Sequence, residues 1–227
     1  MDEANLKQKE QEIRRQILQS SFDAKACHIG SALSCVGIMV DLFYNRLQEG
    51  DIFLFSKASG VATFYSILAD KGFFPKEKIA EYLHDYPLPS REVPGVVFSC
   101  GSLGHGLPVA CGLAHANPDK KVYVLISDAE CQEGTTYESA LFAHHHDLKN
   151  LHVIVDNNAI QACDHTYNIL NLNLTAFPFL KESFPDIDIV NTIKGDGVDF
   201  MEDSPEWHYR NLTPELLDEA LKQIDEK

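Results

Sequence analysis

Two short apolar runs, about thirty positions apart, each end in residues rich in side-chain oxygen. Residues 122–126 lead directly into Ser127-Asp128-Ala129-Glu130, and residues 151–155 lead into Asp156-Asn157-Asn158. Short continuous apolar runs of this kind are typical of the buried strands of a parallel sheet. The carboxyl ends of such strands share one edge and form the usual ligand crevice of an open α/β sheet. The pattern therefore predicts an α/β fold with a ligand site at that edge.

The oxygen atoms at this edge indicate a hard divalent cation. A carboxylate from Asp128, an amide oxygen from Asn158 and a backbone carbonyl suit Mg²⁺ or Ca²⁺, and a bound diphosphate would complete the shell. Residue type alone leaves a second interpretation open for Asp128, as a cap of the following helix. A structural interpretation is open for Glu133 as well: it could be an acidic residue in the first turn of a helix, where the helix dipole stabilises its charge.

The remaining pattern alternates helices with short strands and shows no internal repeat. Helices are expected at 5–21, at a segment near 36–43 capped by Ser31 or Ser34, and at 60–69, 75–83, 104–114 and 135–146. A last helix is expected to open at Thr213-Pro214, with Thr as its cap. Strands are expected at 53–55, 122–126, 153–155 and 187–193. The crossover between the second and third of these strands suits a parallel connection.

The bulk properties bound the possible partners and location. At 227 residues, the chain is expected to form one domain over 1–227. A net charge of −15 argues against nucleic-acid and anionic-membrane surfaces. The longest apolar stretch, 35–40, is too short to span a bilayer. The six cysteines include no Cys-x-x-Cys pair, and the first 15 residues are charged, so we expect a cytoplasmic protein.

Several motifs occur in an order typical of one family. They are Cys27-His28-Ile29-Gly30-Ser31, Phe55-Ser56-Lys57-Ala58-Ser59-Gly60, Pro94-Gly95-Val96, Gly101-Ser102-Leu103-Gly104-His105-Gly106, the Asp128 and Asn158 segments, Lys194-Gly195-Asp196-Gly197 and Trp207-His208. Together they resemble the thiamine-diphosphate-dependent transketolase family over most of the chain. The resemblance implies the diphosphate-binding (PP-type) domain, a three-layer α/β/α fold with a mainly parallel sheet. Residues 173–193 look too short for one of the family's strand–helix units, so the sheet is expected to be shortened at one edge.

The resemblance implies a role for each matching residue. Asp128, Asn158 and the carbonyl of Ile160 would be the ligands of Mg²⁺ (or Ca²⁺). His28, Glu133 and His208 would be catalytic, with the two histidines near substrate and cofactor phosphates. The cofactor thiamine diphosphate would be bound by Gly101, Ser102, Leu103, Gly104, His105, Ser127, Asp128, Ala129, Glu130, Asn158, Ile160 and Ser59.

The family's pyrimidine-binding domain has no counterpart in this sequence. We therefore expect a heteromeric transketolase-like transferase, with that domain on a second subunit (α2β2) and a sugar or keto acid as substrate. Ser127-Asp128-Ala129 replaces Gly-Asp-Gly, and Ser59 and the Pro87 region replace two family histidines. These departures leave open a catalytically degenerate scaffold subunit. An unrelated nucleotide-binding protein would need a phosphate-cradling Gly-x-x-x-x-Gly-Lys-Ser loop, which the sequence lacks.

Overall fold

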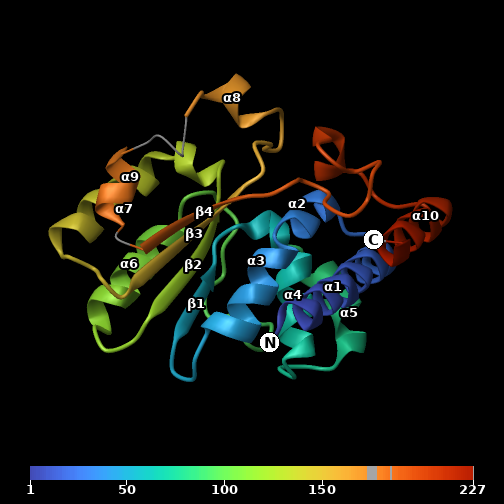
Figure 1. Cartoon of the computed structure of the whole chain (residues 1–227), viewed down its shortest axis with the longest axis horizontal. Helices are drawn as coiled ribbons and strands as arrows, with labels where there is room; N and C mark the ends of the chain where they lie inside the picture. The colour runs from blue at the N-terminus through green and yellow to red at the C-terminus, as the bar shows by residue number, and fades with distance from the viewer. Residues whose placement is uncertain (173–177, 185, 227) are drawn as a thin grey trace. The chain divides into compact units, whose positions relative to one another are not determined.

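In the described part of the chain, four parallel strands form one sheet in the order β1-β2-β3-β4 (Figure 1). The computed structural model describes residues 1–172, 178–184 and 186–226. The strands are β1 (Ile52–Phe55), β2 (Val122–Ser127), β3 (Leu151–Asn157) and β4 (Asp186–Asn191). In the register, Ser127 of β2 lies opposite Asp156 of β3, so the two strands end side by side. The predicted α/β class with a parallel sheet is confirmed.

The chain divides into two compact units, each made of separate stretches of sequence. The sheet unit comprises Gln48–Ala58 and Val96–Asn191, and the helical unit comprises Met1–Leu47, Ser59–Gly95 and Thr192–Lys227. Besides the strands, the sheet unit contains α6 (Gly106–Ala116), η4 (Glu130–Gln132), α7 (Gly134–His145), α8 (Thr166–Ile169) and α9 (Pro178–Ser183). A single cofactor-binding domain over the whole chain stays a prediction.

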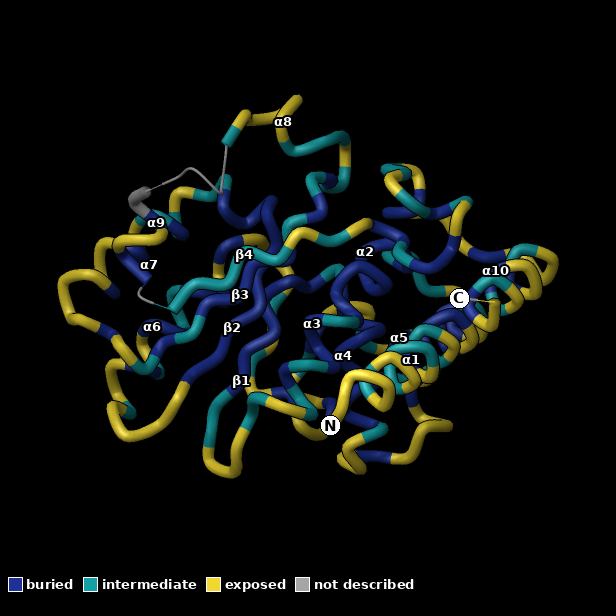
Figure 2. The backbone as a smooth tube through the Cα atoms, viewed as in Figure 1, coloured by how far each residue is buried: buried dark blue, intermediate teal, exposed yellow. Residues whose placement is uncertain are grey.

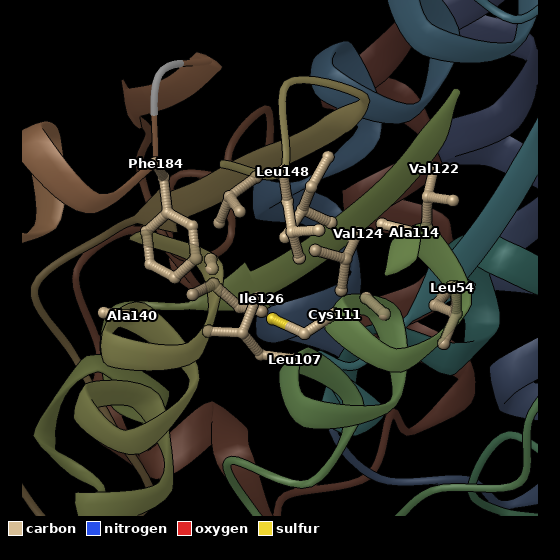
Figure 3. Close-up of a cluster of buried hydrophobic side chains, with 14 of the residues drawn as sticks. Leu54, Leu107, Cys111, Ala114, Val122, Val124, Ile126, Ala140, Leu148 and Phe184 are labelled. Carbon is tan, nitrogen blue, oxygen red and sulfur yellow. The ribbon is translucent and has the colours of Figure 1, made fainter. Parts of the chain in front are cut away.

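The core of the sheet unit lies between the sheet and helices α6, α7 and α9. Alternate strand residues contribute to it, among them Val122, Val124 and Ile126 of β2, because successive side chains of a strand point to opposite faces. Leu107 and Cys111 of α6 lie beside Ile126 in this cluster (Figure 3). Strands β2 and β3 are buried along most of their length (Figure 2). A core this continuous holds the carboxyl ends of both strands in place.

The helical unit is organised around α1 (Glu3–Ala24), which contacts α2, α3, α4, α5 and α10. Those helices are α2 (Ile29–Ser34), α3 (Val36–Asp41), α4 (Val61–Asp70), α5 (Ile79–Asp85) and α10 (Pro214–Glu226). The shorter elements of this unit are the π-helix η1 (Leu42–Arg46) and the 3₁₀ helices η3 (Lys76–Lys78) and η6 (Pro205–His208). A further 3₁₀ helix, η2 (Ala58–Gly60), begins in the sequence of one unit and ends in that of the other. Across the residues that the structure describes, no helix has the length and apolar character needed to cross a membrane.

The predicted elements are present with shifted ends, and the structure also differs from the prediction in several places. Ser31 and Ser34 do not cap a helix: both lie inside α2, whose N-cap is His28. The Ser34 hydroxyl donates to the Ser31 carbonyl over 3.1 Å, a bond that competes with the helical pattern shortly before the break at Cys35. Helices α2, α8 and α9 were not expected, and the segment before α9, 173–177, falls outside the described residues. The Thr213 cap is confirmed, since its hydroxyl accepts from Leu216 N at 3.3 Å.

Candidate functional site

The predicted oxygen ligands of the sheet unit meet at the carboxyl ends of β2 and β3. Asp128 follows the last residue of β2, and its backbone N–H donates to the Asp156 carbonyl of β3 over 3.1 Å. Asn158 follows the last residue of β3. Asp128 and Asn158 are 3% and 5% exposed, so both side chains are held inside the protein. The parallel register thus brings together the residues that lie thirty positions apart in sequence.

The Asp128 carboxylate joins the two strand ends. One oxygen accepts from Ala129 N at 2.8 Å, and the other accepts from Ala159 N at 2.6 Å in the loop after β3. The helical turn η4 that follows Asp128 has Ala129 as its N-cap, and helix α7 has Glu133. The interpretation of Asp128 as a cap of the following helix is therefore wrong. The carboxylate instead fixes the loop that carries Asn158 and Ile160.

That loop has a special backbone conformation. Ala159 has φ +62°, in the left-handed region that non-glycine residues adopt at a cost of about 1 kcal/mol or more. The Asn158 side-chain oxygen accepts from Ile160 N at 3.0 Å, closing a tight turn. The bonds of Ala159 to Asp128 and of Ile160 to Asn158 oppose this cost. Strained backbone conformations that the surrounding structure stabilises, as here at Ala159, cluster at functional sites.

The charges at this edge are unbalanced. Asp128, Glu130 and Asp156 are buried carboxylates, whereas Lys57 is the buried cation that pairs with Asp156. Burial, and then repulsion by Asp156, raises the pKa of Asp128 to about 6, although Lys57 opposes the shift. The carboxylates at this edge outnumber the lysine that pairs with them, so a bound divalent cation would be stabilised here.

The donor set also fits a cation that a diphosphate completes. No group of three or more His, Cys, Asp or Glu side chains that could hold a metal lies within residues 1–172, 178–184 and 186–226. A single carboxylate, an amide oxygen and a carbonyl form only part of a shell. This is how Mg²⁺ is usually bound, through one or two carboxylates together with substrate phosphates and water.

Glu130 lies fully buried beneath the site, and both of its carboxylate oxygens are occupied. One oxygen accepts from the Ser56 hydroxyl and from Gly104 N at 3.2 Å. The other accepts from Ser127 N at 2.8 Å and from the Ser127 hydroxyl at 3.2 Å. Burial raises the pKa of Glu130, and these hydrogen bonds oppose the shift. Glu130 thus connects the end of β1, the end of β2 and the glycine-rich segment before α6.

The glycine-rich segment, residues 101–105, exposes Gly101, Ser102, Leu103 and His105 but buries Gly104. Gly104 has φ +78°, and a β-carbon there would overlap Thr135 Oγ1 and lie 2.9 Å from Glu133 Cβ. Glycine is therefore required at position 104. Half-buried Glu133, predicted to be catalytic, lies against this backbone.

The helical unit brings His28 and His208 together. Their rings lie 4.6 Å apart, and the His28 backbone N–H donates to the His208 carbonyl over 2.9 Å. Buried Lys194 Nζ lies 3.3 Å from His208 Nδ1, within hydrogen-bond distance. Burial, and then the charge of Lys194, lowers the pKa of His28. Half-buried Ser59 belongs to this unit and lies in η2.

Sequence reasoning missed the roles of three charged residues. Lys57 and Asp156 form an ion pair that is 2% and 0% exposed, and Lys194 is completely buried beside His208. The available signal was a charged residue within three positions of the end of a strand, where a buried charge loses its solvation and needs a partner. All three stand inside the sequence motifs, but the motifs alone do not reveal their partners.

Known proteins resemble this chain in sequence. The family described as "Thiamine pyrophosphate enzyme, C-terminal TPP binding domain" matches residues 79–226. A relative from Actinobacillus succinogenes, named as one subunit of apulose-4-phosphate transketolase, is 33% identical, over 98% of this chain and 96% of the relative. The protein of the same name from Phocaeicola vulgatus is 31% identical, over 94% of this chain and 92% of the relative.

A solved structure matches the whole fold. The crystal structure of transketolase from Campylobacter jejuni matches with a TM-score of 0.86 at 23% identity, covering 99% of this chain. The chain spans 43% of the length of that transketolase. With the family match over residues 79–226 and relatives above 30% identity that align over more than 90% of both chains, the chain belongs to the transketolase family of thiamine pyrophosphate enzymes.

Proposed function

We propose that this chain is the diphosphate- and Mg²⁺-binding subunit of a transketolase-like transferase that moves a two-carbon ketol or related acyl-anion unit between carbonyl compounds. The observation that carries the proposal is the meeting of Asp128 and the Asn158 loop at adjacent strand ends, with an excess of buried negative charge. In this proposal, Asp128, Asn158 and the Ile160 carbonyl hold Mg²⁺, or Ca²⁺ in its place.

The chain's own residues would bind and orient the cofactor. Thiamine diphosphate, when bound, supplies a nucleophilic carbon that attacks carbonyl groups and stores an acyl-anion equivalent. Residues 101–105 offer backbone to the cofactor near Gly104, while Ser127 and Ala129 flank the metal ligand. Ala129 has φ −61°, so it needs no glycine-like conformation. This removes one reason for regarding the chain as a degenerate scaffold.

A second subunit with a pyrimidine-binding domain would complete each site, in an α2β2 assembly. The two relatives described above are each named as one subunit of a transketolase, which supports a split enzyme. We place the partner surface on the glycine-rich segment and on helices α6 and α7. The two helices border a groove of about 330 Å³. Glu133, at the start of α7, would then lie near the glutamate that activates the cofactor.

We also propose a cytoplasmic location, where the buried thiols of Cys111 and Cys131 stay reduced.

The substrate would differ from the common pentose and hexose phosphates. Ser59 and Pro87 stand where the family has phosphate- or substrate-facing histidines, and each lost charge-assisted hydrogen bond removes about 1.5–3 kcal/mol. We propose a modified, bulkier or nucleotide-linked sugar, or a small keto acid. The two relatives are named for apulose 4-phosphate. Steady-state rates of the reconstituted pair should show kcat/KM for xylulose 5-phosphate and ribose 5-phosphate below the usual enzyme range of about 10⁴–10⁸ M⁻¹s⁻¹. Values within that range would contradict the proposal.

The metal assignment is tested by calorimetry on the reconstituted pair. Asp128→Ala should abolish Mg²⁺-dependent binding of thiamine diphosphate, because it leaves the diphosphate charge poorly neutralised. Asp119→Asn, in an exposed turn of the same unit, is the control and should bind as the wild type does. Unchanged affinity in Asp128→Ala would refute the assignment.

A further inference from the structure

We propose that Glu130 is a positioning residue, which holds residues 101–105 in the conformation that receives the cofactor diphosphate. The inference rests on the proposed function and deepens it. Glu130 acts through the segment that it binds, because its own carboxylate faces the protein interior and is 0% exposed.

The bond to Gly104 is the contact that matters. Gly104 N donates to Glu130 over 3.2 Å, and this is the residue with φ +78° in the segment. A glycine in a flexible segment can adopt many backbone conformations. A buried acceptor for its N–H group favours the one conformation in which that bond forms. The neighbouring residues Leu103 and His105 are exposed and contribute less to this selection.

The same carboxylate fixes the metal side of the site. Its second oxygen accepts from Ser127 N, and the Ser127 hydroxyl in turn accepts from Glu130 N at 3.3 Å. Ser127 directly precedes the proposed metal ligand Asp128. One side chain therefore sets the distance between the diphosphate-facing backbone and the metal ligand.

The network requires an acceptor at both oxygens. Gly104 N donates to one oxygen and Ser127 N to the other, and the Ser56 and Ser127 hydroxyls each contact one of them as well. In Glu130→Gln, the amide NH₂ group would face either the Gly104 N–H or the Ser127 N–H, leaving a buried donor without an acceptor. In Glu130→Asp, the charge is kept but the side chain is one methylene too short to reach both segments.

Hydrogen exchange and calorimetry on the reconstituted pair test the proposal. Without cofactor, exchange of the Gly104 amide should rise about tenfold or more in Glu130→Gln, and the dissociation constant of thiamine diphosphate should rise by a similar factor, as is typical for supporting residues. Glu130→Asp should show a smaller rise of both. Glu182→Gln, the same change at an exposed position of α9, should change neither. Strand β2 amides report global stability and should be unaffected.

The outcomes separate this inference from the proposed function. Unchanged Gly104 exchange in both Glu130 variants overturns it. Faster exchange with unchanged cofactor affinity also overturns it, because the segment's conformation would not matter for binding. If wild-type protein binds no thiamine diphosphate, the proposed function fails, and with it the diphosphate role of Glu130. Increases in both quantities support the inference.

Discussion

At the scale of single residues, the site depends on a few positions where only one residue type fits. Gly104 is one of them, since its φ is positive and Thr135 and Glu133 occupy the space of a β-carbon. Gly112, in the middle of α6, differs in both respects: its φ lies outside the left-handed range, and no atom lies within 4 Å of the position that a β-carbon would take. The two glycines therefore provide a matched comparison.

We expect Gly104→Ala and Gly112→Ala to change stability in opposite directions. Gly104→Ala should lower the free energy of unfolding by about 1–3 kcal/mol, through strain and overpacking. Gly112→Ala should raise it by about 0.5–1 kcal/mol, because alanine is the better helix former. Urea denaturation of the purified chain measures both values. Equal effects of the two substitutions would contradict the backbone geometry at position 104.

At the scale of elements, Asp70 joins four segments of the helical unit. It lies at the end of α4 and accepts from Lys9 of α1 at 3.1 Å and from Lys76 of η3 at 2.7 Å. The Tyr44 hydroxyl of η1 also donates to it. Burial alone would raise the pKa of Asp70, but the bonds from Lys76, Tyr44 and Lys9 outweigh burial and lower the pKa to about 2.

This network predicts a pH-dependent contribution to stability. Because the pKa is lower in the folded state, the contribution is full above the unfolded value, about 4, and is lost as pH falls toward 2. Asp70→Asn should lower the free energy of unfolding by about 1–2 kcal/mol at pH 7, after screening by solvent. The difference from wild type should narrow below pH 4. Denaturation curves at pH 7, 5 and 3.5 check this, and a constant difference would contradict it.

The elements themselves could largely be predicted from sequence, because strong local signals mark them. Apolar runs bounded by polar residues gave β2 and β3, and Thr213-Pro214 marked the start of α10. The break at Cys35 and the π-helix η1 could not be predicted, since both depend on packing of a continuously apolar segment. Within the site, the adjacency of the proposed ligands Asp128 and Asn158 could be predicted, because each follows a buried apolar run. The Lys57–Asp156 pair and the contacts of Glu130 could not, because residues from different strand ends meet only in the folded sheet.

At the scale of the whole molecule, activity should require a partner. The second subunit is proposed to supply the pyrimidine-binding domain and its activating glutamate. The purified chain should therefore show no turnover of ketose substrates, and activity should appear on mixing with the partner. Light scattering of the mixture should give the mass of two copies of each chain. If the chain alone turned over ketose substrates at the rate of the mixture, the proposed requirement for a second subunit would be contradicted.

The most direct test of the central claim is the metal dependence of cofactor binding to the wild-type pair. Calorimetric titration with thiamine diphosphate should show one cofactor per copy of this chain when Mg²⁺ is present, because the cation balances the diphosphate beside Asp128. After chelation of divalent cations, binding should fall below detection, and added Mg²⁺ or Ca²⁺ should restore it. Binding of equal affinity with and without the metal, or no binding in either condition, would contradict the account.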